Sequence, residues 1–561
     1  MENVKEFFTK TWVWVILLSL PAGWALLVPG FYGASDDMHI GWFHQMDRAI
    51  SMGQIPPRLA PDLSFGFSYP LFNFLFPLPF YIAEIFHLLS LGLVDSIKAV
   101  FFISIILSAL GMYWLLKELV KNRGLALAGA LIYVYTPYRA VDLYIRGAIG
   151  EIVSFAILPL VALSVVKLTS VENSKRINYR WLGIGGVAFS SLVLSHNITA
   201  YMFLPFIFLL GFLRIFLQTK KWFSLVGLML TVFLGLLISL YFWLPAIVES
   251  VLMKYDTVFN FVDHFPTLRQ LITPHWGYGA SVPGPYDGMP FFIGTINLGL
   301  VIIGVPILAI SWRRFSPGEK VVLIWAYLVL AVSVMMMNHR SSPLWQNLPL
   351  LPYFQFPWRF LIMVTFITPL LIMTLGKLGR PKIMTATLIG LVIVLNISNF
   401  RPEDFLGRGD DYYLKRYIPV PVANEEYLQI QEEYFRLPKD TQLRPDKNYP
   451  LVSAKGGDIK NIIKRSELDV VIETSALNPM IINFNKYFFP GWQAEIDGQQ
   501  AAIIPGKPFG QITLKVPPGE HQVKISFTET NFKKVLDIMS LSGLLLALWW
   551  ILNPHFKKFK L

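Results

Sequence analysis

The chain has 561 residues, of which 54% are hydrophobic and only 15% are charged. One water-soluble core cannot bury so much apolar surface, so the composition excludes an ordinary soluble protein and indicates a membrane protein. The net charge is +12, but the basic residues lie in short loops and form no continuous stripe, which argues against nucleic-acid binding. The chain has no cysteine, so disulfides and thiolate metal sites are excluded.

Apolar segments follow one another along most of the chain, and many are close to the ~20 residues that a membrane-spanning helix needs. The first follows two lysines but has no clear small-residue cleavage site, so we interpret it as an uncleaved span. The segments lie roughly at residues 12–30, 71–92, 97–116, 125–137, 151–166, 181–196, 199–213, 223–247, 291–311, 321–337, 358–376, 382–398 and 535–553.

Clusters of Lys and Arg between these segments predict the topology. They lie at residues 5–10, 117–123, 175–180, 214–221, 313–320, 377–382 and 557–560. Because Lys and Arg collect on the cytoplasmic side, two spans should separate neighbouring clusters. That rule fails only between the first two clusters, which enclose three apolar segments. The segment 71–92 is the weakest of the three, because it contains prolines, a glutamate and a histidine. We predict that it lies at the interface or dips in without crossing.

The predicted fold is a polytopic α-helical membrane protein with about 12 spans and both termini in the cytoplasm. Residues 1–398 form its transmembrane domain, with the first outside loop at 31–96. Residues 399–534 form an extracytoplasmic domain, and 535–561 a final span with a basic tail. Strand-like runs separated by turn signals predict a small β-sandwich at about 460–530. The clearest runs are 468–473, 480–484, 511–516 and 522–527.

The first outside loop carries two adjacent carboxylates, Asp36 and Asp37, directly after the first span. Residues 38–52 have apolar side chains at helical spacing, which predicts a helix along the membrane with both carboxylates at its N-terminal end. Adjacent carboxylates repel, so one can be held partly protonated or act as the base that glycosyl transfer requires. Alternatively, Asp36 caps the helix and Asp37 is solvated. His39 follows as a candidate substrate-binding residue.

Several later loops carry candidate phosphate-binding residues. Arg146 and Glu151 lie in YIRGAIGE, Arg340 in NHRSSP and Arg359 in FQFPWRFL. An arginine at the membrane surface can bind a lipid phosphate through two parallel hydrogen bonds, or it can anchor the end of a helix. Both interpretations stay open from the residues alone.

The motif SHNITA places His196 and Asn197 between two apolar segments. This pair could bind a sugar or a phosphate, but capping of the two helix ends is the favoured interpretation. The aromatic, acidic and histidine residues of 248–290 are typical of a carbohydrate-binding surface. No metal-site spacing occurs there, so the metal is unknown. The sequence has no Walker loop, GxGxxG or HExxH motif, which leaves ATP-driven transport and Rossmann-type chemistry unsupported.

Several of these motifs together resemble one known family. They are SDDMHIGWFHQMDRAISMGQIPPR, YPLFNFLFPLPFY, YIRGAIGE, SHNITA and FQFPWRFL. They resemble the bacterial membrane family labelled "6-pyruvoyl-tetrahydropterin synthase related", although no zinc-binding histidine cluster of a soluble pterin enzyme is present. The region 1–400 looks like a glycosyltransferase of the GT-C class. The C-terminal stretch that begins at FNKYFFPGWQAEIDG and ends at EHQVKISF resembles the terminal domain of YfhO-like proteins.

This resemblance implies a function. GT-C enzymes use polyprenyl-phosphate-linked sugars and place an acidic residue just after the first span, where Asp36 and Asp37 lie. The resemblance therefore implies that one of them is the catalytic base, with Asp37 preferred, and that Arg146, Arg340 or Arg359 stabilises the departing phosphate. The transferred hexosyl or pentosyl group would go to a glycan, lipid or protein. No cofactor is certain, and a divalent metal stays open because only some GT-C enzymes use one.

Two other functions remain as alternatives. A transporter or flippase of lipid-linked glycans would need ionisable residues inside the spans, whereas here the charges gather in the outside loops. A non-enzymatic envelope assembly protein would instead bind a partner through its β-domain, and would not depend on Asp36 or Asp37.

Overall fold

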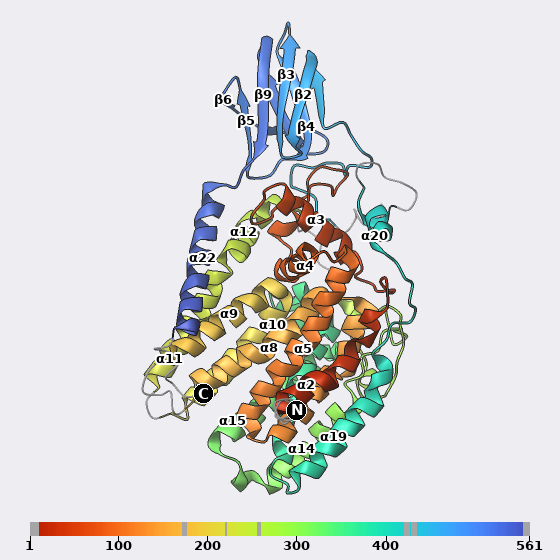
Figure 1. Ribbon diagram of the computed structural model, residues 1–561, viewed down its shortest axis with the longest axis vertical. Coiled ribbons are helices and arrows are strands. Elements are labelled where there is room, and N and C mark those ends of the chain that lie inside the picture. Colours follow the sequence, from red (N-terminus) through yellow and green to blue (C-terminus); the bar gives the residue numbers. More distant parts are fainter. Residues whose placement is uncertain are drawn as a thin grey trace, which may run out of the picture.

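The computed structural model describes residues 10–170, 177–218, 221–254, 260–419, 427 and 435–553. Helices form an elongated body, and two β-sheets sit at one end of it (Figure 1). The basic cluster predicted at 557–560, and parts of those at 5–10, 175–180 and 214–221, lie outside the described residues.

Seven helices in the described part are long and apolar enough to cross a membrane. An eighth span exists if Trp222–Ile238 and Leu240–Leu252, which are bent by 68°, count as one. The larger number of about 12 stays a prediction. The seven are α5 (Leu93–Val120), α8 (Ile149–Leu168), α10 (Asn197–Ile215), α15 (Pro317–Met337), the stretch Pro357–Leu375, α19 (Pro381–Asn396) extended to Asn399, and α22 (Asn531–Leu552).

Shorter helices complete the helical body. They are α2 (Thr11–Ser19), η1 (Leu20–Leu27), α3 (His39–Ser51), α4 (Leu78–Leu88), α6 (Arg123–Val134), α7 (Pro137–Ala140), η3 (Val141–Arg146), α9 (Tyr179–Ser195), α11 (Trp222–Ile238), α12 (Leu240–Glu249), α14 (Thr295–Ile310), η8 (His339–Ser341), η10 (Pro357–Phe360), α17 (Leu361–Ile367), η11 (Thr368–Leu371), α18 (Ile372–Leu375) and α20 (Asp410–Tyr417). The only helix of more than three residues in 71–92 is α4, with 11 residues, or about 16 Å, roughly half of a bilayer core.

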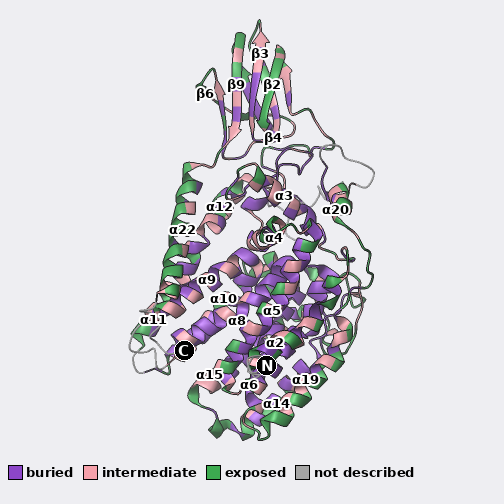
Figure 2. Cartoon of the chain, in the orientation of Figure 1, coloured by how far each residue is buried: buried purple, intermediate pink, exposed green. Residues whose placement is uncertain are grey.

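Burial divides the helices into an inner and an outer set. In α8, 94% of the apolar 18-residue stretch is buried, whereas the buried share is 22% in α22 and 11% in the span that begins with α19. Figure 2 shows the same contrast in its colours. The outer helices therefore present apolar side chains to their surroundings, as lipid-facing helices do. Glycines allow close helix packing, since a side chain at Gly235 of α11 would collide with the Phe189 ring of α9.

The β-strands form two antiparallel sheets, with orders β1-β4-β8-β7 and β2-β3-β9-β5-β6. All four predicted strand runs are confirmed, because each falls largely in β3, β4, β8 or β9. The sheets begin at Val452, before the expected start at about 460, and their packing as a sandwich stays a prediction. The strands are β1 (Val452–Lys455), β2 (Asp458–Ser466), β3 (Asp469–Ala476), β4 (Met480–Tyr487), β5 (Trp492–Ile496), β6 (Gln499–Ala501), β7 (Ile504–Pro505), β8 (Gln511–Val516) and β9 (Gly519–Phe527).

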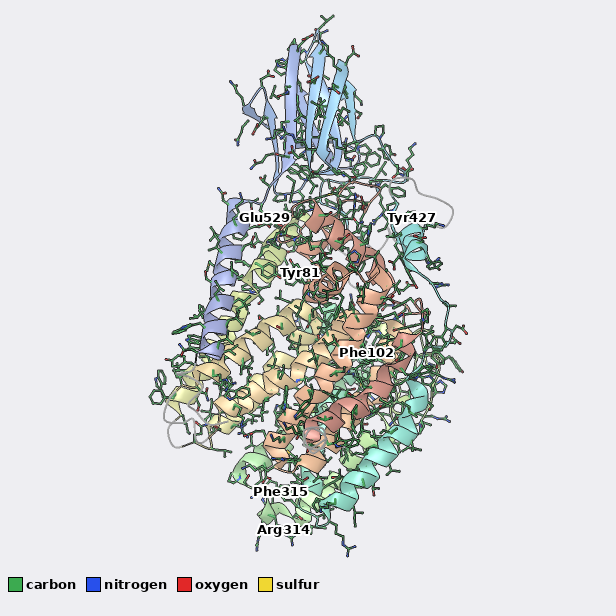
Figure 3. The ribbon with its side chains drawn as sticks, in the orientation of Figure 1. Tyr81, Phe102, Arg314, Phe315, Tyr427 and Glu529 are labelled. Carbon is green, nitrogen blue, oxygen red and sulfur yellow. The ribbon has the colours of Figure 1, made fainter. Side chains whose placement is uncertain are left out.

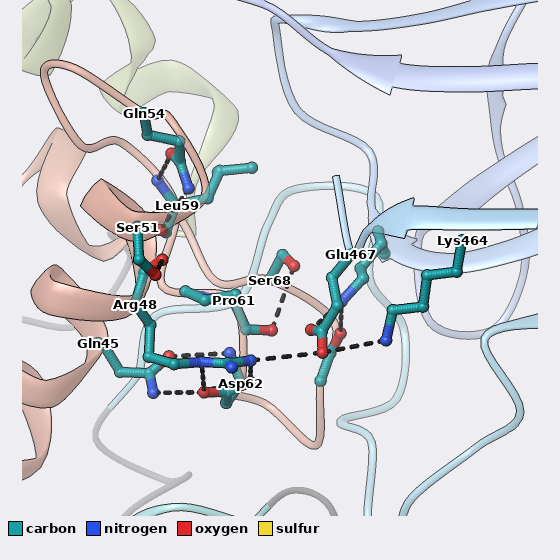
Figure 4. Close-up of polar contacts among 12 residues, drawn as sticks. Gln45, Arg48, Ser51, Gln54, Leu59, Pro61, Asp62, Ser68, Lys464 and Glu467 are labelled. Carbon is teal, nitrogen blue, oxygen red and sulfur yellow. Dashed lines mark hydrogen bonds and ion pairs between the residues drawn. The ribbon is translucent and has the colours of Figure 1, made fainter. Parts of the chain in front are cut away.

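Ion pairs join the sheets to the loop after α3 (Figure 4). Arg48 Nη2 lies 2.9 Å from Asp62 Oδ1 and 3.4 Å from Glu467 Oε1. Lys486, buried in β4, lies 3.4 Å from Glu467 Oε2 and donates to the Gly66 carbonyl at 2.6 Å. Burial alone would raise the pKa of Glu467, but Lys486, Lys464 and Arg48 together lower it below its usual value.

A second group of ion pairs fixes the sheets where the chain leaves them for α22. The buried Arg58 guanidinium lies 2.5 Å from Glu529 Oε1 and 3.0 Å from Asp537 Oδ1. It also donates to the Tyr241 carbonyl of α12 at 2.9 Å. Figure 3 labels Glu529 at this junction. The sheets are therefore held to the helical body at two separate places.

Candidate active site

Arg146 is the centre of a buried cluster of charged side chains. Its Nη1 lies 2.5 Å from Asp142 Oδ1 and 2.8 Å from Glu151 Oε2, and its Nη2 lies 3.8 Å from Asp36 Oδ2. The guanidinium face lies 4.9 Å from the Trp358 ring centroid. Residues from the first loop, from η3, from α8 and from η10 thus meet at one arginine.

The backbone around Arg146 explains how the side chain reaches this place. Arg146 ends η3, which is a π-helical turn, and such turns occur often at functional sites. Gly147 follows with φ +68°, a left-handed conformation that favours glycine, and α8 begins two residues later. Arg146 lies before this turn and Glu151 lies after it, and the reversal brings the two side chains close enough to pair.

The loop that carries Asp36 is fixed to the same turn by backbone hydrogen bonds. Ser35 N donates to the Ile145 carbonyl at 3.0 Å, and Asp36 N donates to the Arg146 carbonyl at 2.7 Å. The Asp36 side chain is 31% exposed, whereas that of Arg146 is only 8% exposed. Asp36 therefore presents its carboxylate to solvent from a rigid backbone.

Arg359 approaches Glu151 from the other side. Its Nε lies 3.2 Å from Glu151 Oε1, and its Nη1 donates to the Phe354 carbonyl at 3.0 Å and to Gln355 Oε1 at 2.6 Å. The Tyr138 hydroxyl donates to Glu151 Oε2 at 3.1 Å. The buried Glu151 carboxylate thus bridges two guanidinium groups and fixes the orientation of both.

Asp36, Arg146 and Arg359 line a cavity of about 700 Å³. Aromatic rings and the residues Glu403, Asp404 and Leu406 complete its lining. The aromatic lining residues are Tyr278, Phe356 and Trp358. Guanidinium groups can hold a phosphate, aromatic faces can pack against sugar rings, and an exposed carboxylate can accept a proton.

Burial, followed by the charge of Glu151, raises the pKa of Asp142 well above its usual value. The neutral form of Asp142 is thereby favoured, which lessens the negative charge beside Arg146.

The two adjacent carboxylates of the first loop have different surroundings. Asp37 is buried, accepts a hydrogen bond from the Tyr417 hydroxyl of α20, and does not line the cavity. Burial raises the pKa of Asp37. The expected helix α3 is confirmed, but its N-cap is Met38 and no side chain caps it. Both parts of the alternative interpretation, a capping Asp36 and a solvated Asp37, are therefore wrong.

Of the predicted histidine and asparagine residues, some lie beside the charged cluster and one lies away from it. His39 is buried, lies close enough to Asp36 and Arg146 to interact electrostatically, and has a pKa that burial lowers. The His196 side chain caps α10 by accepting from Thr199 N at 3.3 Å, which confirms the favoured interpretation for His196 and for this one helix end. Asn197 is exposed and lies apart from the cavity lining.

Arg340 lies in a different groove from the other two predicted arginines. It is exposed at η8, beside Leu268, Met335 and Leu344. The structure therefore brings Arg146 and Arg359 together but leaves Arg340 out. In the described ranges, no group of three or more His, Asp or Glu residues could hold a metal ion.

Sequence reasoning missed several residues of the site. Asp142 lies four residues before Arg146, a spacing at which helical side chains meet, so it could have been found. Gln355 stands four residues before Arg359 and offers the same signal. Glu403 and Asp404 come from a charged connecting segment, and no local pattern marks them as part of the site.

The comparison with protein families gives the identity of the chain at family level. The family model of the 6-pyruvoyl-tetrahydropterin synthase related domain, a membrane protein, matches residues 72–402, which is more than half of the chain. The chain belongs to this family. The match covers η3, α8, η10 and the start of the segment after α19, but not Asp36 or the β-sheets. As a member of this membrane family with several apolar helices, the protein is a multi-pass membrane protein.

No curated protein matches the sequence significantly. Among solved structures, the chain is similar to the arabinofuranosyltransferase AftD from Mycobacteria, with a TM-score of 0.43 and 13% identity. That match covers 70% of this chain but 27% of AftD. A mutant of AftD gives a TM-score of 0.44 and 13% identity, covering 70% and 28%. The chain thus spans little more than a quarter of AftD, and we draw no functional conclusion from so weak a similarity.

Proposed function

We propose that this protein is a GT-C-type glycosyltransferase of the cytoplasmic membrane. It would transfer a hexosyl or pentosyl group from a polyprenyl-phosphate-linked donor to a glycan, lipid or protein acceptor on the extracytoplasmic side. The observation that carries this proposal is the common cavity of Asp36, Arg146 and Arg359. It combines an exposed carboxylate with two rigidly held guanidinium groups, which are the groups that displacement of a phosphate by a hydroxyl requires.

In the proposed reaction, Asp36 takes the proton of the acceptor hydroxyl. The hydroxyl oxygen attacks the anomeric carbon of the donor and forms the new glycosidic bond, while the bond from that carbon to the phosphate oxygen breaks. The electron pair of the broken bond stays with the polyprenyl phosphate. Arg146 and Arg359 stabilise the negative charge that develops there, and Glu151 keeps both guanidinium groups in place before the reaction.

The wider architecture is part of the same proposal. About 12 spans would surround a bundle in which the polyprenyl chain lies between helices. The two sheets would form an extracytoplasmic sandwich beside the opening of the cavity and help to hold the acceptor. We propose Asp36 as the base in preference to Asp37, because Asp36 lines the cavity and Asp37 does not. His39 and His196 would support the site from behind, and no step requires a metal.

The test is sugar transfer by purified protein reconstituted in lipid, using labelled polyprenyl-phosphate sugars as donors. Asp36→Asn should lower kcat by about a hundredfold or more, since a general base contributes at least that much. Asp411→Asn is the matched control, because Asp411 is exposed on α20 and lies outside the cavity lining. Equal transfer by wild type and Asp36→Asn would remove Asp36 as the base. Movement of lipid-linked glycans without any transfer would favour the flippase alternative.

A further inference from the structure

The segment that follows α19 lies across the loop that carries Asp36. We call residues 400–417 the strap; it ends in α20 (Figure 1). Phe31 N donates to the Arg408 carbonyl at 2.8 Å, and Arg408 N donates back to the Phe31 carbonyl at 3.4 Å. The two backbones are so close that a side chain at Gly30 would collide with Gly407. The strap is thus paired with the first loop like a short piece of sheet.

Asp410 fixes the middle of the strap to the N-terminus of α5. Its Oδ2 accepts from Leu93 N at 2.8 Å, and its Oδ1 accepts from Val94 N at 2.9 Å. Both are first-turn amides of α5, which have no partner within the helix. The strap therefore has a second fixed point on a membrane-spanning helix.

The end of the strap is held to α3 through Asp37. The Tyr417 hydroxyl donates to Asp37 Oδ1, and both residues are buried. A side chain on Gly41 of α3 would come within 2.9 Å of Tyr417 Cβ, so the two helices touch at this place. Burial raises the pKa of Asp37, whereas the Tyr417 hydrogen bond and the nearby Arg416 and Arg408 oppose that shift. Asp37 is thus a buried carboxyl group whose hydrogen-bond partner comes from the strap.

The start of the strap forms part of the cavity. Glu403, Asp404 and Leu406 line it together with Arg146 and Arg359. The carboxylates of Glu403 and Asp404 only accept hydrogen bonds, so they suit the hydroxyl groups of an acceptor sugar and disfavour the donor phosphate. The position of the strap therefore sets the width and chemistry of the acceptor side of the cavity.

We propose that Asp37 is a positioning residue that acts through Tyr417: it holds the strap against the first loop and so positions the acceptor-binding wall, which is formed by Glu403, Asp404 and Leu406. The adjacent carboxylates would then have separate roles, with Asp36 taking the proton and Asp37 holding the wall. The assignment of that wall to the acceptor rests on the proposed function, whereas the contact between Asp37 and Tyr417 does not.

Hydrogen exchange and kinetics together test this proposal. Asp37→Ala and Tyr417→Phe each remove the contact, so amide exchange of the strap in the double variant should be no faster than in either single variant. Asp37→Asn keeps an oxygen that can accept from Tyr417, so its amide exchange should stay closer to that of the wild type. Tyr412→Phe is the matched control, because its hydroxyl makes no hydrogen bond within the described ranges.

Amide exchange across 403–417 should become roughly tenfold faster in Asp37→Ala and Tyr417→Phe, and stay unchanged in Tyr412→Phe. In transfer assays, both variants should raise the acceptor KM several-fold while kcat changes less than about twofold. Unchanged exchange in both variants would overturn the proposal. A kcat loss in Asp37→Asn equal to that in Asp36→Asn would also overturn it. If wild-type protein transfers no sugar, the proposed function fails, and the exchange experiment still decides whether Asp37 holds the strap.

Discussion

Arg146 Nη1 lies 2.8 Å from Glu151 Oε2, and the other oxygen of the same carboxylate lies 3.2 Å from Arg359 Nε. The Glu151 side chain is 1% exposed, and each arginine side chain is 8% exposed. One carboxylate therefore contacts two buried guanidinium groups. The order of the site depends on this carboxylate, although Glu151 itself does not line the cavity.

Removal of the Glu151 charge should therefore destabilise the folded protein. Glu151→Gln leaves two buried guanidinium groups without their shared anion, and breaking a buried pair in this way costs about 3–5 kcal/mol. Thermal unfolding of purified protein should show a clear fall in Tm. Glu118→Gln is the control, because Glu118 pairs with Lys167 at a more exposed position and should change stability by about 1 kcal/mol or less. Similar Tm values for the two variants would contradict the shared role of Glu151.

The arginines Arg359 and Arg340 should differ in their effect on transfer. Arg359→Lys keeps the charge but loses the planar group that contacts Glu151 and Gln355, so kcat should fall by about a hundredfold. Arg340→Lys should leave kcat and the donor KM near the wild-type values, because Arg340 lies in a separate groove. Steady-state kinetics with a labelled donor would measure both. A larger loss in Arg340→Lys than in Arg359→Lys would mean that the donor phosphate binds elsewhere.

Gly147 should not tolerate a side chain. Its φ of +68° is strained for other residues, and a Cβ atom would lie 3.1 Å from the Ala34 side chain, two residues before Asp36. Gly147→Ala should cost about 1–2 kcal/mol and displace the first loop, so that both Tm and kcat fall. Gly299→Ala in α14 is the control, because nothing lies within 4 Å of a Cβ there. If Gly147→Ala matched this control in both measurements, the turn would not position Asp36.

Attachment of the sheets should weaken in acid. The pKa of Glu467 is lower in the folded protein than the ordinary value of 4.5, so its stabilising contribution is complete above that value. The contribution is lost as the pH falls below 4.5 toward the folded-state pKa. The protection of amides in 60–70 and 464–487 against hydrogen exchange, corrected for the intrinsic exchange rate at each pH, should therefore fall as the pH is lowered from about 5.

Glu467→Gln should remove much of this pH dependence, since its amide cannot titrate. Glu520→Gln is the control, because Glu520 pairs with Lys460 at an exposed position. An identical exchange profile in wild type and Glu467→Gln would show that other groups hold the sheets in place.

Local patterns predicted those parts of the molecule whose contacts are local. The alternation in β4 and the helical spacing of α3 are set by which face is buried, and both elements occur where expected. The capping role of His196 is also local, because Thr199 is three residues away. Such features follow from the backbone geometry of one element.

The division of roles between Asp36 and Asp37 could not be predicted in this way. Asp37 and Tyr417 are 380 residues apart in the chain, and nothing near either residue indicates the other. The same is true of Glu403 and Asp404, which reach the cavity because the strap pairs with Phe31. Adjacent residues in a loop point to different neighbours, so their chemistry depends on which distant segment covers each one.

The two attachments of the β-sheets have a mechanical consequence. One lies at the loop after α3, through Arg48 and Lys486, and the other lies at the start of α22, through Arg58. A domain attached at two points can rotate only about the line that joins them, whereas a domain attached by a single linker can reorient freely. The orientation of the sheets relative to the helical body is therefore nearly constant.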